Sequence, residues 1–197
     1  MHVLLINGSP HEKGCTYTAL SLVAGELNAA GITTEILNVG TKPVGGCIGC
    51  GGCAKGNGCV FGGVVNEAIE KAKTADAFVF GTPVHYASAS GNMTSFLDRL
   101  AYAGGKYLAY KPAAICASAR RAGTTSALDQ LVKYPEFFHM PLVSGSYWPM
   151  VHGSNPEQVL QDEEGCAVMK ELGRNMAWLL QCIEAGKAAG ISHPENP

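Results

Sequence analysis

Five short runs of mostly apolar residues are spread along the chain. They cover residues 2–7, 33–39, 75–81, 112–118 and 141–147. A continuous apolar run of this length is typical of a strand that is buried on both of its faces. The sequence therefore predicts five strands of a parallel sheet that other elements cover on both sides.

The segments between these runs have helical periodicity. Their apolar residues recur three or four positions apart, as on one face of an amphipathic helix. These residues are Thr16, Leu20, Val23, Leu27 and Ala30, before Gly31; Val65, Ala68, Ile69 and Ala72; Phe96, Leu97 and Leu100; residues 124–132; and Met169, Leu172, Met176, Leu180 and Ile183. We expect the last helix to open at Asn155, because Pro156 suits the first helical position.

Alternating strands and helices predict an α/β fold, with a five-stranded parallel sheet of order 2-1-3-4-5 and helices on both faces. At 197 residues we expect a single domain with a cysteine-rich insertion at about residues 43–61. Ligands of such sheets bind outside the carboxyl ends of the strands, where the strand order reverses. The loops after residues 7, 81 and 118 are therefore expected to build one site.

The first of these loops, residues 7–16, runs from a strand into the start of a helix. Backbone N–H groups at a helix start, with the hydroxyls of Ser9 and Thr16, favour phosphate binding. His11 or Lys13 could add a charge or a donor. The alternative is an ordinary turn in which the serine caps the helix.

The second and third loops offer groups for a planar ligand. Pro83 fixes the backbone directly after a strand, and His85 and Tyr86 provide π-faces and hydrogen bonds. Arg120 and Arg121 follow the fourth strand, and arginine suits a phosphate or an electron-rich ring edge. The alternatives are plain loop residues and a solvated pair of surface arginines.

Four of the eight cysteines fall between residues 47 and 59. Their spacing is C-x2-C-x2-C-x5-C, formed by Cys47, Cys50, Cys53 and Cys59. Two-residue gaps let thiolates face a common centre, and four thiolates in so short a span suit a 4Fe-4S cluster. A four-cysteine zinc site and free thiols on a glycine-rich loop remain as alternatives. Cys116, Cys166 and Cys182 are expected to be small core residues.

Composition narrows the function classes. Hydrophobic residues make up 47% and charged residues 15%, against about 25% charged in an average protein. With a net charge of −2, these values argue against disorder and against a nucleic-acid partner. The apolar start ends at Asn7, too early for a signal peptide or a membrane span. We expect a cytoplasmic protein with no membrane partner.

Four short motifs carry a resemblance to a known family. They are Gly8-Ser-Pro10, Gly14-Cys-Thr16, Gly81-Thr-Pro-Val-His-Tyr86 and Ser95-Phe-Leu-Asp-Arg99. In this order the chain resembles the NADPH-dependent FMN reductase group of flavodoxin-like proteins, and within it the iron-sulfur flavoprotein family. That family carries a compact cysteine motif between its second strand and second helix, where this chain has one.

The resemblance implies FMN as a cofactor and assigns residues to it. The implied phosphate ligands are Ser9, Gly14, Cys15 and Thr16, with His11 where relatives often have a basic residue. The isoalloxazine ring would lie over Pro83, Val84, His85 and Tyr86, and its other side would meet Ser118, Ala119, Arg120, Arg121 and Gly123.

We therefore expect an FMN oxidoreductase with a 4Fe-4S cluster. Electrons would come from NAD(P)H or a ferredoxin-like donor and pass to a quinone, an oxygen species or a small electrophile. The resemblance also implies a homodimer or homotetramer. No acid–base residue stands out, although His85, Tyr86 and Arg121 could steer the flavin or a substrate. The alternatives are a cluster-free flavin, quinone or azo reductase, a non-enzymatic electron carrier, and a zinc-stabilised binding module.

Overall fold

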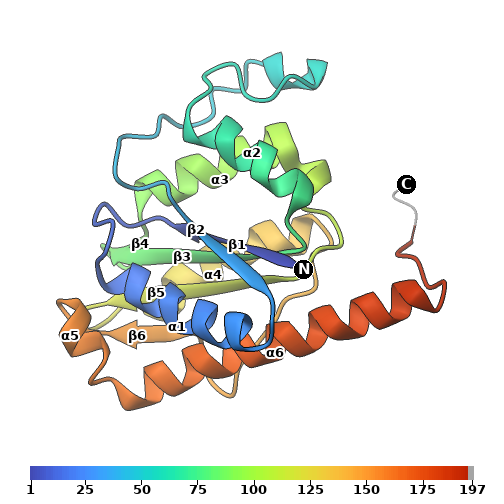
Figure 1. Ribbon diagram of the computed structural model, residues 1–197. Coiled ribbons are helices and arrows are strands. Elements are labelled where there is room, and N and C mark those ends of the chain that lie inside the picture. Colours follow the sequence, from blue (N-terminus) through green and yellow to red (C-terminus); the bar gives the residue numbers. More distant parts are fainter. Residues whose placement is uncertain (195–197) are drawn as a thin grey trace.

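A computed structural model describes residues 1–194 of the chain. Its sheet has the order β2-β1-β3-β5-β6, and all four of these pairings are parallel (Figure 1). A sixth short strand, β4, pairs antiparallel with β3. The five parallel strands thus have the predicted 2-1-3-4-5 order, and the antiparallel strand is an addition that the sequence did not predict.

The strands are β1 (His2–Asn7), β2 (Thr33–Asn38), β3 (Ala77–His85), β4 (Ser88–Ala89), β5 (Ala113–Ala119) and β6 (Met150–His152). The α-helices are α1 (Cys15–Ala29), α2 (Val64–Thr74), α3 (Gly91–Gly104), α4 (Thr124–Phe137), α5 (Pro156–Val159) and α6 (Glu163–Ala188). Two short 3-10 turns are η1 (Gly52–Lys55) and η2 (Gly105–Tyr107).

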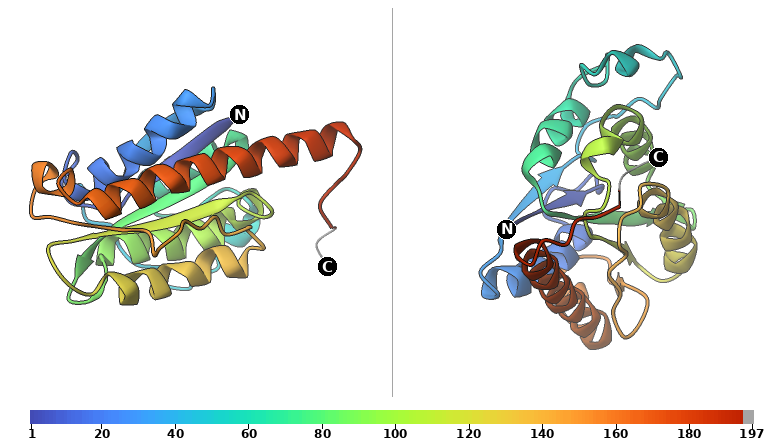
Figure 2. Two further views of the ribbon diagram at one scale, coloured as in Figure 1. Left: turned by 90° about the horizontal axis from the view of Figure 1, so that it is seen from below. Right: turned by 90° about the vertical axis from the view of Figure 1, so that its right-hand side faces the viewer.

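Helices cover both faces of the sheet, as predicted. Helices α1 and α6 pack together on one face, and α2, α3 and α4 cover the other (Figures 1 and 2). Alternate residues of each strand enter the two cores, so Leu4 and Phe78 face α2 and α3, whereas Leu5 and Val79 face α1 and α6. The strands are buried on both sides because the sheet lies between two layers of helices.

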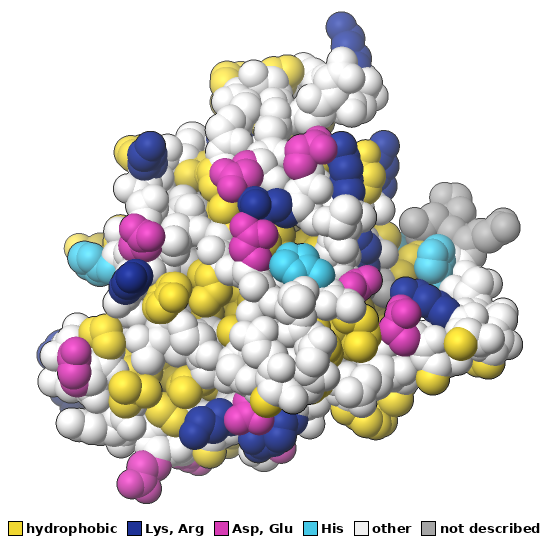
Figure 3. All heavy atoms as spheres, in the orientation of Figure 1, with side chains coloured by type: hydrophobic (Ala, Val, Ile, Leu, Met, Phe, Trp, Pro, Cys, Tyr) yellow, Lys and Arg dark blue, Asp and Glu magenta, His cyan; other side chains and the backbone are white. Residues whose placement is uncertain are grey.

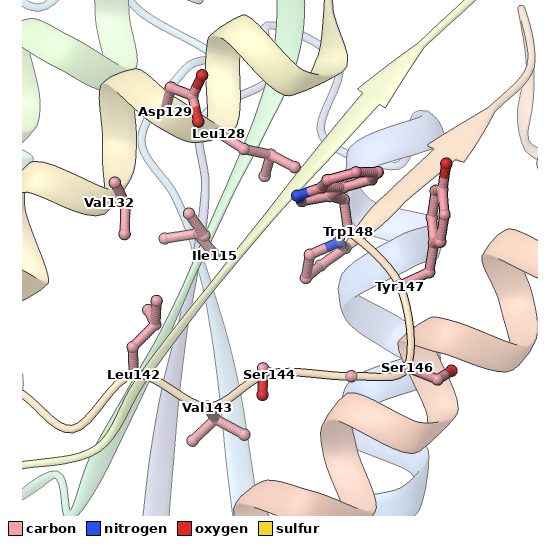
Figure 4. A pocket seen from close by; sticks show the side chains of 12 residues that line it. Ile115, Leu128, Asp129, Val132, Leu142, Val143, Ser144, Ser146, Tyr147 and Trp148 are labelled. Atoms are coloured by element: carbon pink, nitrogen blue, oxygen red, sulfur yellow. The ribbon is translucent and has the colours of Figure 1, made fainter.

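The fifth strand lies elsewhere than the sequence predicted. Residues 141–147 form only an isolated bridge between Leu142 and Ala113, and the strand that pairs with β5 is β6, formed by Met150–His152. Between these two points the chain bends away from β5. The bend leaves a cavity of about 500 Å³ against α4, with Tyr147 and Trp148 at its rim (Figure 4).

The predicted loop at residues 82–90 is largely a hairpin. β3 continues through Pro83 to His85, turns at Tyr86 and Ala87, and returns as β4. Both turn residues have positive φ, 51° for Tyr86 and 58° for Ala87. Positive φ at both central residues of a two-residue hairpin turn matches the twist of the flanking strands.

The helix predictions hold with two corrections at helix ends. Helix α1 ends at Ala29, so Ala30 is an exposed residue at the C-cap rather than part of the buried face. Asn155 and Pro156 open a helix as predicted, but that helix is the short α5, which ends at Val159. The long helix α6 then begins after Asp162, whose carboxylate caps it by accepting from the N–H of Gly165.

Of the three cysteines that the sequence predicts as core residues, Cys116 is buried and Cys166 is half-buried. The prediction is wrong for Cys182, which is exposed on α6.

Charged side chains of both signs are interspersed over the face shown in Figure 3, without a patch of one sign. This agrees with the small net charge of −2. Among residues 1–194, no helix is long and apolar enough to cross a bilayer.

Candidate functional site

Three loops meet at the carboxyl edge of the sheet, as the strand order predicts. The hydroxyls of Thr16 and Ser118 lie 2.7 Å apart and join the first loop to the third. Ser90 joins the first loop to the second, because its hydroxyl donates to the carbonyl of Gly8 at 2.9 Å and its N–H donates to Thr82 Oγ1 at 3.0 Å. The three loops therefore form one connected structure.

Buried polar side chains fix the first loop internally. Asn7, which is fully buried, accepts the N–H of Ser9 at 3.1 Å and donates to the carbonyl of Glu12 at 3.2 Å. Ser9 accepts in turn from the N–H of His11 at 3.1 Å. These bonds hold residues 7–12 in one conformation and leave the His11 side chain exposed.

Helix α1 starts beside this loop with free donor capacity. Its first intrahelical bond runs from the N–H of Thr18 to the carbonyl of Gly14 at 3.0 Å, so the N–H groups of the preceding turn have no partner within the helix. The first turn of α1 carries no acidic residue. Burial raises the pKa of the Cys15 thiol, so Cys15 brings no negative charge to this position at neutral pH. The arrangement suits an anion such as a phosphate.

A negative charge at residue 15 is expected to weaken FMN binding at least about tenfold, or about 1.4 kcal/mol. In Cys15→Asp the carboxylate would lie at the helix start and repel a phosphate there. The helix dipole favours this carboxylate, but the carboxylate also meets the carbonyl of Gly153, to which Cys15 Sγ donates at 3.5 Å, so the melting temperature of each FMN-free variant is measured as a check of its folding. Flavin fluorescence titration measures the affinity. The neutral Cys15→Asn is the control, and equal affinities for the two variants would contradict a phosphate at this position.

The residues predicted to hold the flavin ring lie on β3 and its hairpin. Pro83 and Val84 are half-buried, whereas His85 and Tyr86 are exposed, with the Tyr86 side chain fully in solvent. On the third loop, Ser118 and Ala119 are buried at the end of β5, and Arg120 and Arg121 are exposed. Gly123 closes this loop against the hairpin: a Cβ there would lie 2.7 Å from the Cα of Ala87. These side chains remain predicted ligands.

The four clustered cysteines line a second site. Cys47, Cys50, Cys53 and Cys59 border one pocket of about 240 Å³. The opposite wall comes from α3, and the apolar residues Val60 and Phe61 complete the rim. Positive φ at Gly51 and Gly56 bends the chain at both ends of η1. Among residues 1–194, no three His, Cys, Asp or Glu side chains lie close enough to hold a single metal ion.

Two side chains, Asn66 and Arg99, fix Cys59, and the sequence alone did not indicate this role for either of them. The amide of Asn66 accepts the N–H of Cys59 at 2.8 Å and donates to its carbonyl at 3.0 Å. Arg99 Nε donates to Cys59 Sγ at 3.2 Å. Arg99 belongs to one of the motifs that carry the resemblance, but its partner lies 40 residues earlier, and no local pattern links the two.

Helix α3 connects the two sites. At its start Ser90 contacts the first loop, and two residues later Asn92 donates to the carbonyls of Gly40 and Lys42 at 3.0 and 3.1 Å. Further along, Arg99 reaches the cysteine pocket. Nine residues separate Ser90 from Arg99, or about 13 Å along the helix axis. One rigid element therefore positions both the three-loop site and the cysteine pocket.

Comparison with known proteins gives matches that extend over most of the chain. The profile of the NADPH-dependent FMN reductase family matches residues 1–155. An iron-sulfur flavoprotein of Methanocaldococcus jannaschii is 26% identical over 192 residues, which cover 93% of this chain and 100% of the relative. An iron-sulfur flavoprotein of Archaeoglobus fulgidus is 30% identical over 175 residues, covering 87% of this chain and 86% of the relative.

Solved structures share the fold at low sequence identity. A flavodoxin from the domain Archaea superposes with a TM-score of 0.62 at 13% identity, over 92% of this chain and 99% of that chain. An NADH:FMN oxidoreductase in its apo form superposes with a TM-score of 0.64 at 20% identity, over 92% and 89%. With the profile match and the two archaeal relatives, the chain belongs to the iron-sulfur flavoproteins of the NADPH-dependent FMN reductase family, and it is an FMN-dependent oxidoreductase of the flavodoxin-like fold.

Proposed function

We propose that this oxidoreductase carries a 4Fe-4S cluster on Cys47, Cys50, Cys53 and Cys59 and couples two-electron to one-electron transfer. The observation that supports this most directly is that all four thiols of the motif border one pocket. Four thiols are the donor set of such a cluster. Each cysteine would bind a different iron of the cluster, so the four thiols need not converge on a single ion. The donor set and the shared pocket therefore fit the group.

The three-loop site is where we propose that FMN binds. The open N–H groups at the start of α1 would hold the phosphate, together with Ser9, and the exposed His11 would add a further donor. The end of β3 and the loop from Ser118 to Gly123 would contact the ring. Bound FMN would accept a hydride, which carries two electrons, and it could then pass these electrons on one at a time.

The donor and acceptor are proposed from chemistry alone. NAD(P)H or a ferredoxin-like protein would supply electrons, and a quinone, an oxygen species or a small electrophile would accept them.

Around the cysteine pocket, large apolar side chains are exposed: Ile48, Val60, Phe61 and Tyr102. Such a rim favours contact with another protein surface. We propose that this surface belongs to a second copy of the chain in a homodimer or homotetramer.

Anaerobic reduction tests the proposed activity. When FMN-loaded protein is mixed with NADPH or NADH, the flavin absorption should bleach, and a quinone added afterwards should restore it over many cycles. The FMN-free protein is the control for direct reduction of the quinone. The contrary result is that one-electron donors reduce the flavin but no small acceptor sustains the oxidation of NADPH or NADH. That result would contradict an NAD(P)H oxidoreductase and favour an electron carrier.

A further inference from the structure

Arg99 is a buried cation at the wall of the cysteine pocket. Only 7% of the residue is exposed. Its guanidinium donates to Cys59 Sγ at 3.2 Å, to the carbonyl of Gly45 at 3.3 Å and to the carbonyl of Gly62 at 3.0 Å. Gly45 precedes the first cysteine of the motif and Gly62 follows the last. One side chain thus ties both ends of the cysteine loop to α3 and reaches a sulfur between them.

Within residues 1–194, no carboxylate forms an ion pair with this guanidinium. The ion pairs of the described chain involve other residues, and the neighbouring Asp98 accepts instead from the hydroxyl of Tyr134 at 2.6 Å. The guanidinium lies 5.6 Å from the ring centre of Phe61, on the side of the pocket. A buried charge is costly unless it is paired. Besides two backbone carbonyls, the group that Arg99 contacts is the sulfur of Cys59, which would be its negative partner once it ligates a cluster.

We propose that Arg99 is a positioning residue that donates a charge-assisted hydrogen bond to the Cys59 sulfur and raises the reduction potential of the centre held there. This inference rests on the proposed function, because it requires the four cysteines to hold a cluster. Hydrogen bonds to the sulfurs and the local charge set the potential of iron–sulfur centres. Adding an electron makes the centre more negative, so Arg99 stabilises the reduced form more than the oxidised form.

The potential of the cluster tests this assignment. In Arg99→Gln the neutral side chain should lower the ratio of reduced to oxidised cluster at a fixed potential by about tenfold, which is about 59 mV for one electron. An anaerobic redox titration followed by electron paramagnetic resonance measures this ratio in the FMN-loaded protein. The flavin potential should not change. Arg174→Gln is the control, since Arg174 is an exposed arginine on α6 that pairs with Glu26.

An unchanged cluster potential in an iron-loaded Arg99→Gln protein would overturn the assignment and leave the proposed function intact. If Arg99→Gln loses its iron, Arg99→Met decides, because methionine removes both the charge and the donors and keeps an unbranched side chain. Retained iron with a lowered potential in the methionine variant supports the proposal. Retained iron at the wild-type potential, or loss of iron from both variants, overturns it. Wild-type protein that holds no cluster would overturn the proposed function as well.

Discussion

Replacing Cys50 by serine is expected to reduce the iron content from about four per chain to near zero, because a 4Fe-4S cluster needs four thiolate ligands. Cys50 is exposed on the cysteine loop and lies at the 240 Å³ pocket, away from the three loops at the sheet edge. The FMN content should therefore stay at its wild-type value. Iron, sulfide and flavin assays on the same anaerobic sample measure the outcome.

Cys182→Ser is the matched control for this change. Cys182 is also an exposed thiol, but it lies on α6 and does not border the pocket. Its replacement should leave iron, sulfide and flavin unchanged. Full iron content in the Cys50→Ser protein would contradict a cluster held by the four cysteines.

Gly40→Ala is expected to have the largest effect on the three-loop site. A Cβ at this position would lie 2.4 Å from the carbonyl oxygens of Gly8 and Ser9, and Asn92 holds the Gly40 carbonyl at 3.0 Å. Backbone atoms must shift to make room, and overpacking of this kind costs about 1–3 kcal/mol of folding free energy. The shift falls on the predicted phosphate loop, so FMN affinity should drop by more than about tenfold.

The control for Gly40→Ala is Gly25→Ala on α1. Nothing lies within 4 Å of a Cβ at Gly25, and alanine replaces glycine in a helix with a gain of about 0.5–1 kcal/mol. Urea unfolding should therefore show a destabilised Gly40→Ala protein and a slightly stabilised Gly25→Ala protein. Flavin titration should show weaker FMN binding than in the wild type for Gly40→Ala and unchanged binding for Gly25→Ala. Wild-type FMN affinity in Gly40→Ala would mean that residues 8 and 9 do not contact the cofactor.

The parallel sheet could be predicted because its signals are local. The run at residues 2–7 coincides with β1, and the predicted face of α2 is buried at all four positions, Val65, Ala68, Ile69 and Ala72. Burial on both faces makes each such strand continuous in its apolar residues. The order of the parallel strands then follows from the alternation of strands and helices.

The errors lie where tertiary contacts decide the local structure. The turn at Tyr86 and Ala87 has positive φ at both residues without glycine or asparagine, so the sequence holds no hairpin signal there. Residues 141–147 are apolar enough for a strand, yet the chain pairs with β5 at length only from Met150. The split between α5 and α6 did have a signal, because Asp162 followed by two glutamates is typical of a helix start.

In the candidate site too, the features with local signals were predicted and those that depend on distant contacts were not. The three loops were predicted because the carboxyl ends of parallel strands share one edge of the sheet. The roles of Ser90, Asn92 and Arg99 could not be predicted from the sequence, because each contacts a segment at least 37 residues away in the chain. Helix α3 brings these three side chains to both sites, and its amphipathic pattern gives no sign of that.

The central claim is that FMN and a 4Fe-4S cluster occupy the same chain. It is tested most directly by a visible absorption spectrum of protein purified without oxygen, with iron, sulfide and flavin assayed on that sample. The account predicts a flavin spectrum over broad brown absorbance, with about four irons and four sulfides per chain. A clean yellow flavin spectrum with no iron, or with zinc in its place, would contradict it.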